Sequence, residues 1–305
     1  MMNQLKMTKK SRRSGLFVKG NLKQNILFGF VFVLFTLYAL TMIASFFILV
    51  MSSLESAYQY ELKLGMGLPF SLPKKLVFDN YEFAFNKLEY RGTSFWGLVI
   101  NSLWYTAIAT ICPLFANACV AYAVSKYNFK LKNVYYGVII FAMTIPIMGT
   151  TGAFMQLIAD LKLYNQGPLL NMTTSFVPGG MSFLVLYAFF KNISWEYAEA
   201  VLVDGGGHFV IFFRIMLPMA IPAVGALALV NGISAWNSYL DILLYNPDWP
   251  TLASGLYGVS QTLPRLGNTP AYYAALVISI IPILTVFIAF SDKVMSNFTV
   301  GGLKG

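Results

Sequence analysis

The stretch EAVLVDGGGHFVIFFRIMLPMAIP, residues Glu199 to Pro222, separates two long apolar runs of this chain. Together with the residues from Ser194 onward, it contains three of the 12 acidic residues and the only histidine, His208. Charged side chains are costly inside a membrane, so a chain that gathers them in one short loop places that loop in water. We therefore expect this segment to contact something outside the bilayer.

The order of residue types in this segment predicts its local structure. Ser194 can cap a short helix that has Glu196 in its first turn. The run from Asp204 to Gly207 then breaks the chain, and an apolar second helix follows as far as Pro218. The sequence thus predicts a helix, a glycine turn and a second helix.

The spacing of these residues resembles the EAA loop of binding-protein-dependent ABC importer permeases, E-A-A-x3-G-x9-I-x-L-P. The positions that carry the resemblance are Glu199, Ala200, Gly205, Ile215, Leu217 and Pro218, with Asp204 before the glycine. Val201 stands where the family usually has a second alanine, and Gly206 stands where alanine is common. An ordinary cytoplasmic connector is the alternative interpretation of the loop.

The resemblance implies that the loop is a coupling helix, which inserts into a groove on a separate ATPase subunit. Glu199 would pair with a basic residue of that subunit, and Ala200 would permit close contact. Gly205 would supply a backbone angle that side chains disfavour.

The composition places the chain among membrane proteins, because 57% of its residues are hydrophobic and only 11% are charged. The formal net charge of +9 could suggest nucleic-acid binding. The basic residues, however, lie in loops between apolar runs rather than on a face with interleaved stacking residues. Cys112 and Cys119 lie in one predicted span, roughly 10 Å apart along a helix, so we expect small buried apolar residues and no disulfide.

Six apolar runs are long enough to cross a membrane, so we expect an all-α protein with six transmembrane helices. The runs are Asn25–Met51, Phe95–Tyr127, Val134–Ile158, Met172–Phe190, Met219–Tyr245 and Pro270–Phe290. Six spans put both termini and the Glu199 loop on one side, which then holds 14 of the 21 lysines and arginines. That excess predicts that both termini and the loop, between spans four and five, are cytoplasmic.

The predicted organisation has three parts. Residues 1–24 form a basic cytoplasmic tail, residues 25–292 form the transmembrane domain with the EAA loop at 194–222, and residues 293–305 form a cytoplasmic tail. The first tail could alternatively recognise an anionic lipid or a partner. The run that follows it is too long for a cleavable signal peptide.

The fifth run contains SAWNSYLDILL, from Ser234 to Leu244, which resembles a stretch that marks the carbohydrate branch of these permeases. Polar side chains in a span must face protein or a wet cavity, so they either line a translocation path or join helices by hydrogen bonds. The candidates for lining a path are Asn231, Trp236, Asn237, Tyr239 and Asp241.

Three further segments resemble parts of the family. FDNYEFAF, from Phe78 to Phe85, resembles a stretch that forms an amphipathic helix along the membrane surface, although an ordinary loop helix is equally consistent with it. Pro247 to Thr269, with Trp249, Tyr257 and Arg265, corresponds to an outer loop that contacts the binding protein in the maltose branch. The ending MSNFTVGGLKG resembles a tail that contacts the ATPase subunits there, which singles out Gly301, Gly302 and Lys304; a frayed terminus is the alternative.

The sequence holds no recognisable catalytic or metal-binding motif. It has no G-x-x-x-x-G-K-[ST] run to hold phosphates and no H-E-x-x-H or Cys/His cluster. His208 is expected to be a surface polar residue. We therefore expect no catalytic residues, no metal and no cofactor in this chain, with ATP and Mg²⁺ bound by partner ATPase subunits.

The resemblance implies a transport complex in a bacterial cell membrane. Its other members are a second permease of similar fold, two nucleotide-binding ATPase subunits and an extracellular solute-binding protein. The expected cargo is a sugar or oligosaccharide, and a non-sugar solute is the alternative. Two other classes compete with this one. An integral membrane enzyme would need a cluster of catalytic residues, and none is evident. A structural anchor would tolerate the loss of Glu199 and Gly205.

Overall fold

The computed structural model describes residues 22–68, 72–145, 149–262 and 268–301. Its elements follow in the order α1 (Leu22–Ser53), α2 (Ala57–Gly65), α3 (Asp79–Asn86), β1 (Glu89–Tyr90), β2 (Thr93–Ser94), α4 (Phe95–Lys126), α5 (Lys132–Thr144), α6 (Thr150–Asp160), α7 (Pro168–Ser175), α8 (Gly180–Asn192), α9 (Glu196–Val203), α10 (His208–Val210), the π-helical segment η1 (Ile211–Met216), α11 (Leu217–Met219), α12 (Ile221–Trp236), α13 (Leu240–Tyr245), α14 (Leu252–Ser260) and α15 (Thr269–Gly301). The two short strands pair antiparallel, with Glu89 opposite Ser94.

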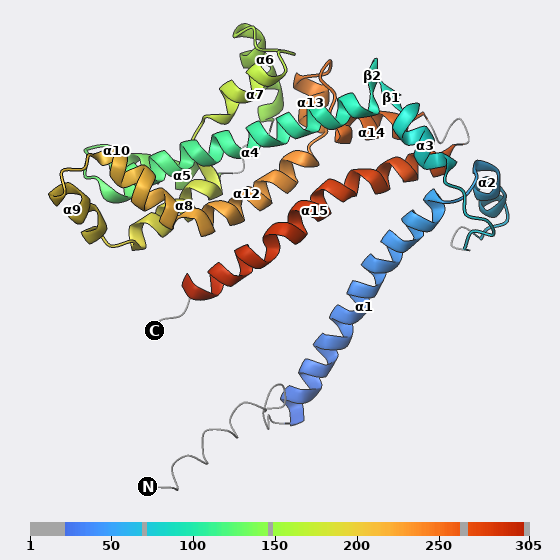
Figure 1. Ribbon diagram of the computed structural model, residues 1–305, viewed down its shortest axis with the longest axis horizontal. Helices are drawn as coiled ribbons and strands as arrows, with labels where there is room; N and C mark the ends of the chain where they lie inside the picture. Colours follow the sequence, from blue (N-terminus) through green and yellow to red (C-terminus); the bar gives the residue numbers. More distant parts are fainter. Residues whose placement is uncertain (1–21, 69–71, 146–148, 263–267, 302–305) are drawn as a thin grey trace.

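Helix α4 is the central element of the fold (Figure 1). Helices α3, α7, α8, α12 and α14 all contact it along its length. One buried apolar cluster lies where α4 meets α8 and η1, and it includes Phe183, Phe190 and Ile211. A second lies at the opposite end of α4, where Phe95 and Leu98 meet α14 and α15. The two clusters therefore hold the neighbouring helices against both ends of α4.

Helix α1 extends away from the other helices and contacts α15 (Figure 1). Its apolar side chains are largely exposed, among them Phe28, Phe32 and Phe35. A continuous apolar helix without a protein partner on most of its surface is stable in a lipid environment, where its backbone is satisfied internally. Residues 1–21 of the predicted basic tail lie outside the described residues.

Three described helices are long and apolar enough to cross a membrane, Gln24–Ser53, Phe95–Lys126 and Thr269–Ala289. Two bent pairs raise the number to as many as five: α7 with α8, bent by 48°, and His208–Met219 with α12, bent by 68°. They correspond to predicted runs one, two, six, four and five. The third predicted run is divided between α5 and α6, and the residues between these helices, 146–148, lie outside the described residues.

The fifth predicted run differs from the structure, because it is not one helix from Met219 to Tyr245. Helix α12 ends at Trp236, and a separate short helix, α13, begins at Leu240. The Asn237 side chain donates to the backbone carbonyl of Ile233 at 2.8 Å, and the Ser238 hydroxyl donates to Asp241 Oδ2 at 2.9 Å. Such local bonds from short polar side chains compete with the helical ladder and interrupt it.

The side chain of Asn117 joins two helices at their irregular points. Pro113 lies inside α4, and the Asn117 amide nitrogen donates to the Pro113 carbonyl at 2.8 Å. The amide oxygen of Asn117 accepts from the backbone N–H of Gly179 at 2.8 Å, in the break between α7 and α8. The Asn117 residue is only 3% exposed. Its amide oxygen therefore satisfies a backbone N–H that the helix break leaves without a regular partner, while its amide nitrogen makes a local bond within α4.

The FDNYEFAF segment forms α3, and α3 packs against α15 and α4. The Asn80 amide nitrogen donates to the carbonyls of Ser53 at 2.8 Å and Glu55 at 2.7 Å. The Tyr81 hydroxyl lies 2.7 Å from the hydroxyl of Ser53. Asn80 therefore binds carbonyls at the carboxyl end of α1, and α3 anchors that end to the body of the protein.

The predicted outer loop from Pro247 to Thr269 contains a helix, because residues 252–260 form α14. Trp249 packs on Gly167, where an added Cβ would lie 2.7 Å from the indole ring. The Asn246 side chain accepts from the Gly167 N–H at 2.9 Å, and Asn101 donates to the Pro250 carbonyl at 2.9 Å. Tyr257 is partly exposed and stacks on Tyr239, whereas Arg265 lies outside the described residues.

Both cysteines are free and half-buried in α4. The expectation that they do not bridge is confirmed.

Replacing Asn117 by leucine is expected to lower the free energy of unfolding by about 1–3 kcal/mol, because it leaves the Gly179 N–H buried without an acceptor. Titration of the purified protein with a denaturing detergent measures this change. Ser125→Ala is the matched control, since the Ser125 hydroxyl bonds only to the Tyr122 carbonyl of its own helix. Equal losses in the two variants would contradict the role of Asn117.

Candidate functional site: a helical elbow and an outer cavity

The Glu199 segment forms an elbow, defined here as α9, the turn 204–207 and the helix from His208 to Met219. It lies at one end of α4, remote from α13 and α14 (Figure 1). Ser194 Oγ accepts from the Glu196 N–H at 3.3 Å, but the N-cap of α9 is Trp195, so the serine contacts the first turn from one residue further out. The prediction of a helix, a glycine turn and a helix is confirmed in form.

The turn ends α9 by a pair of backbone hydrogen bonds. The Gly205 N–H donates to the Leu202 carbonyl at 3.1 Å, and the Gly206 N–H donates to the Val201 carbonyl at 2.8 Å. This is the Schellman pattern, which requires a left-handed residue after the helix cap. Gly205 supplies it with a φ of 81°, as the sequence predicts.

Val201 and Gly206, the two departures from the EAA pattern, are in direct contact. A Cβ added to Gly206 would lie 2.4 Å from Val201 Cγ1 and 3.0 Å from the Val201 carbonyl oxygen. Valine at position 201 therefore requires glycine at position 206 in this conformation. The two departures form one complementary pair.

The second arm of the elbow is interrupted near Pro218. Residues 211–216 are π-helical, and the helix bends by 68° between Met219 and Ile221. Pro218 and Pro222 have no N–H to donate to the preceding turn, and a proline ring crowds the carbonyl four residues before it. These two prolines explain why the arm does not continue straight into α12.

Buried contacts attach the elbow to the body. Ala198, Ile211 and Met216 are each 0% exposed and belong to the cluster around α4 and α8. Tyr127 lies at the junction, because its hydroxyl is 2.9 Å from His208 Nδ1 and its ring packs edge-on against Trp195. Lys126 Nζ donates to the Ile193 carbonyl, just before α9.

Sequence reasoning missed the role of Lys126 and Tyr127 as attachments of the elbow. The positive charge of Lys126 counted only toward the side of the membrane that the turn faces, and Tyr127 was not considered. His208 is exposed, as expected, but it is also bonded to Tyr127.

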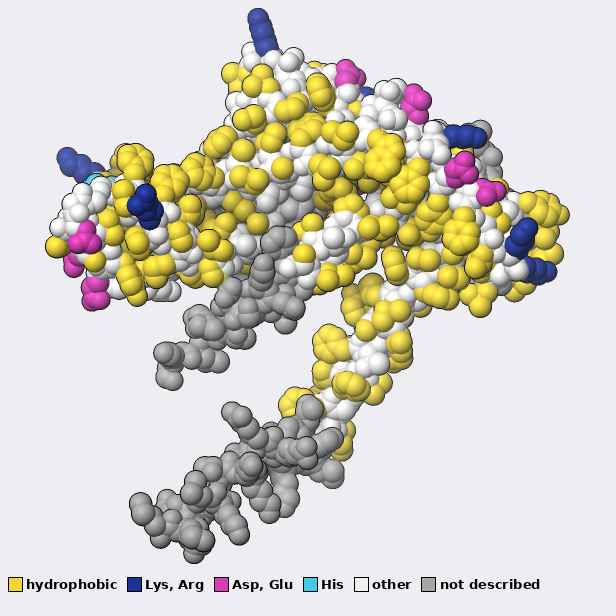
Figure 2. Space-filling view, viewed as in Figure 1, with side chains coloured by type: hydrophobic (Ala, Val, Ile, Leu, Met, Phe, Trp, Pro, Cys, Tyr) yellow, Lys and Arg dark blue, Asp and Glu magenta, His cyan; other side chains and the backbone are white. Residues whose placement is uncertain are grey.

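The surface of the elbow combines acids with exposed apolar side chains. Glu196, Glu199, Ala200, Asp204 and Gly205 are all exposed. Beside them, Val203 is 87% and Phe209 is 82% exposed. Figure 2 shows acidic and apolar side chains together at this end of the molecule. Large apolar side chains next to water indicate a surface that contacts a partner.

The later positions of the pattern have a different environment. Ile215 and Leu217 are half-buried, and Leu217 packs against the cluster beneath the elbow, whereas Pro218 is exposed at the bend. The first positions of the pattern therefore form the outer surface of the elbow, and the last positions attach and bend its second arm.

The five predicted path residues are spread over different environments. Asn231 donates to the Ser182 hydroxyl at 3.2 Å, so it joins α12 to α8. Trp236 is buried, and Asn237 and Tyr239 are exposed near the α12–α13 break. Only Asp241 of the five lines the cavity described next.

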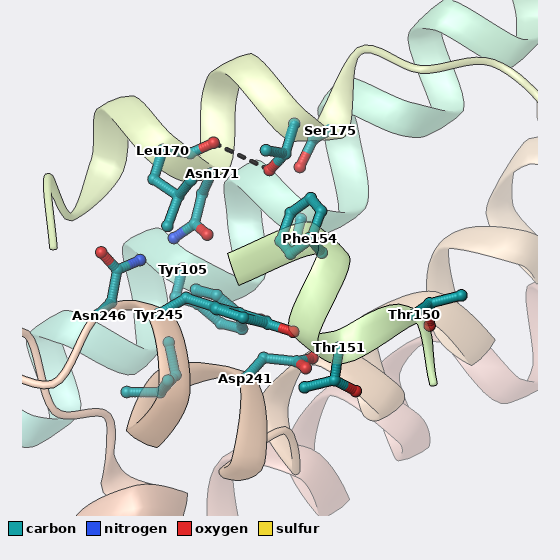
Figure 3. Close-up of a pocket in the computed structure, with 13 residues that line it drawn as sticks. Tyr105, Thr150, Thr151, Phe154, Leu170, Asn171, Ser175, Asp241, Tyr245 and Asn246 are labelled. Carbon is teal, nitrogen blue, oxygen red and sulfur yellow. Dashed lines mark hydrogen bonds between the residues drawn. The ribbon is translucent and has the colours of Figure 1, made fainter. Parts of the chain in front are cut away.

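This cavity, called the outer cavity because it lies away from the elbow, has a volume of about 430 Å³ and is bordered by α4, α6, α7 and α13 (Figure 3). Tyr105, Thr151, Asn171 and Asp241 supply polar groups to its wall. Sequence reasoning did not predict it, because its walls come from four separate segments.

Gly301 of the predicted tail site is the last residue of α15, and Gly302 and Lys304 lie outside the described residues. In the described part of the chain, no group of three or more His, Cys, Asp and Glu side chains is placed to hold a metal ion.

This architecture defines the class of the protein: a helical membrane protein with bent spans and an exposed elbow. The chain belongs to the family of binding-protein-dependent transport system inner membrane components, whose model matches residues 118–296. That match includes the whole elbow and most of the residues around the outer cavity.

Three of the relatives whose names specify a cargo are as follows. The chain is 29% identical over 276 residues to the arabinooligosaccharides transport system permease protein AraQ of Bacillus subtilis, covering 89% of this chain and 94% of the relative. It is 28% identical over 243 residues to the diacetylchitobiose uptake system permease protein NgcG of Streptomyces coelicolor, covering 78% of each. It is 27% identical over 241 residues to the trehalose transport system permease protein SugB of Mycobacterium tuberculosis, covering 77% of this chain and 84% of the relative.

A solved structure shares the fold. A chain from a bacterial ABC transporter involved in the import of the acidic polysaccharide alginate superposes with a TM-score of 0.71 and 22% sequence identity. The match covers 90% of this chain and 98% of that chain.

Replacing Gly206 by alanine is expected to loosen the elbow, because the new methyl group overlaps Val201. Hydrogen exchange of the amides in residues 196–207 should accelerate about tenfold, which corresponds to about 1.4 kcal/mol of local stability. Val201→Ala in the same chain should restore part of the protection, and the contact with the Val201 carbonyl keeps the recovery incomplete.

The matched control is Gly207→Ala, since nothing lies within 4 Å of a Cβ at that position. If the double variant exchanges as fast as Gly206→Ala alone, the two residues are not a complementary pair.

Proposed function

We propose that this chain is a permease subunit of an ATP-binding cassette importer that moves a sugar or oligosaccharide into a bacterial cell. The names of the three relatives above each specify a saccharide, which favours this cargo over a non-sugar solute. The family description itself specifies an inner membrane component that depends on a binding protein. The chain would therefore be a multi-pass protein of the cell membrane.

The proposed topology has six spans with both termini and the elbow in the cytoplasm. The third span would combine α5 and α6, which lie on either side of residues 146–148. The distribution of basic residues supports this orientation. The corresponding division is a tail at 1–24, a transmembrane domain at 25–292 containing the loop 194–222, and a tail at 293–305.

The exposed elbow is the observation that carries the proposal. Its acids and its apolar side chains Val203 and Phe209 are exposed on the side away from the helix bundle, while the buried Ala198 and Ile211 attach it to the bundle. A surface that is exposed on one side and buried on the other can transmit force from a partner to the bundle. Glu199 would pair with a cation of an ATPase subunit, and Ala200 would permit close contact.

The proposed mechanism is mechanical coupling. ATP and Mg²⁺ would bind to two separate ATPase subunits, whose closure draws together the elbows of this chain and of a second permease of similar fold. The bent spans would then expose the path alternately to each side. The free energy comes from differential binding of ATP and of the loaded binding protein to the two states.

The chain itself would bind no cofactor and perform no catalysis in this scheme. The tail residues Gly301, Gly302 and Lys304 would contact the ATPase subunits, as the resemblance implies. Asn231 and Trp236 would hold the spans together rather than line a path, since one bonds to Ser182 and the other is buried.

Charge reversal at the elbow tests the coupling. In the complete transporter, Glu199→Lys is expected to reduce sugar uptake and the ATPase stimulation by the loaded binding protein at least about tenfold, because it replaces a charged pair by repulsion. Gly205→Val should have a similar effect, because a β-branched side chain disfavours the observed φ.

The matched controls are Glu82→Lys, an exposed acid on α3, and Gly207→Ala in the same turn. Co-purification of all subunits verifies assembly. Normal uptake in both Glu199→Lys and Gly205→Val, with assembly intact, is the result that refutes coupling through the elbow.

A further inference from the structure

The outer cavity is large enough for a small organic ligand. Its volume of about 430 Å³ lies within the range of about 300–1,000 Å³ that is usual for ligand pockets. Its wall is formed by the amino end of α6, by α7, by α13 and by the middle of α4. The cavity is far from the elbow along α4 (Figure 1), so the coupling role leaves it unexplained.

The polar groups of the cavity suit a polyhydroxylated ligand. Figure 3 shows Asn171 and Asn246 on one side of the cavity and Asp241 with Thr151 on the other. Amide and hydroxyl groups can both donate and accept, and a carboxylate accepts only. Sugar hydroxyls also donate and accept, so they match this mixture.

Two aromatic rings supply an apolar wall. Phe154 and Tyr245 pack edge to face with centroids 4.9 Å apart and an interplanar angle of 77°. Both residues line the cavity. The C–H faces of a pyranose or furanose ring are apolar and can pack against such a wall, while the hydroxyl groups at the ring edge reach the polar side chains.

Asn171 carries an unsatisfied polar group beside the cavity. Its amide nitrogen is buried and has no hydrogen-bond partner among the described residues. A buried donor without an acceptor costs free energy, and nearly all such groups in proteins are satisfied. A hydroxyl oxygen in the cavity would satisfy this nitrogen once the Asn171 side chain, which lines the cavity, rotates the buried nitrogen toward it.

The charge of the cavity restricts the ligand further. Asp241 is the only charged side chain among the described residues that line it, and no lysine, arginine or histidine is present there. The Ser238 hydroxyl donates to Asp241 Oδ2 and fixes the carboxylate. A second carboxylate brought by an acidic sugar would meet repulsion without a compensating cation.

We infer that the outer cavity is a binding subsite for a neutral saccharide on this chain, with Asp241 and Asn171 contacting sugar hydroxyls and Phe154 and Tyr245 contacting the ring. This inference rests on the proposed sugar import and adds that the cargo is neutral. It separates this chain from the alginate importer, whose title describes an acidic polysaccharide, despite the shared fold.

Binding of defined trisaccharides to the complete transporter in lipid nanodiscs, without the binding protein, tests the inference. The probes are arabinotriose, maltotriose, triacetylchitotriose and the acidic trisaccharide triguluronate, each followed by saturation-transfer NMR. At least one neutral probe is expected to bind at least about tenfold more tightly than triguluronate.

Two variants identify the site. Asp241→Asn should weaken the neutral probe about tenfold, because a hydrogen bond to a carboxylate becomes one to a neutral amide. Asn171→Leu should weaken it similarly, and it should not lower the thermal unfolding midpoint, because the amide nitrogen loses no protein partner. This combination separates a ligand contact from a structural role.

The matched controls are Asp160→Asn, an exposed acid at the end of α6, and Thr173→Val, an exposed residue of α7 that does not line the cavity. Both should bind the neutral probe like the unaltered protein. Unchanged binding in Asp241→Asn and Asn171→Leu, or tighter binding of triguluronate, would overturn the neutral subsite while leaving sugar import intact. If the unaltered transporter hydrolyses ATP but takes up no saccharide, the proposed cargo class itself fails.

Discussion

The bond from the Gly179 N–H to Asn117 meets, at one helix break, the constraint on which this architecture depends. In a bilayer, each backbone N–H and C=O must find a partner within the protein, which normally forbids interrupted helices. This chain interrupts one span between α7 and α8, and the buried amide oxygen of Asn117 on α4 accepts from the Gly179 N–H there. The bond satisfies a group at the bend and holds the start of α8 against α4.

The same constraint operates at the two ends of α4. At one end, Lys126 binds the Ile193 carbonyl and Tyr127 meets His208, so the elbow is attached through the backbone of the preceding helix. At the other end, Asn101 and Ser102 bind backbone groups at Pro250 and Leu252. The central helix therefore links the elbow and the outer segments by directional bonds as well as by apolar packing. Motion at the elbow would reach the outer cavity through a stiff element.

The elbow could be predicted from the sequence because its structure is encoded locally. A serine just before the first helix, an Asp-Gly run and two prolines determine where its helices begin, stop and bend. The breaks in the apolar runs could not be located in the same way, since hydropathy measures length and not continuity. The end of α12 at Trp236 depends on side chains that bond to nearby backbone, and α13 depends on Asn246, which binds Gly167 some 80 residues away. The outer cavity needs four such segments to meet, which no single stretch reveals.

The contact between Val201 and Gly206 constrains how this elbow can be exchanged with that of a relative. Valine at position 201 leaves no room for a side chain at position 206, so the two positions must be exchanged together. A chimeric permease that takes its first elbow helix from an alanine-bearing relative and its turn from this chain would leave a gap at the turn. The reverse combination would place a methyl group inside a valine side chain. The boundary of a transplanted segment must therefore fall outside both residues.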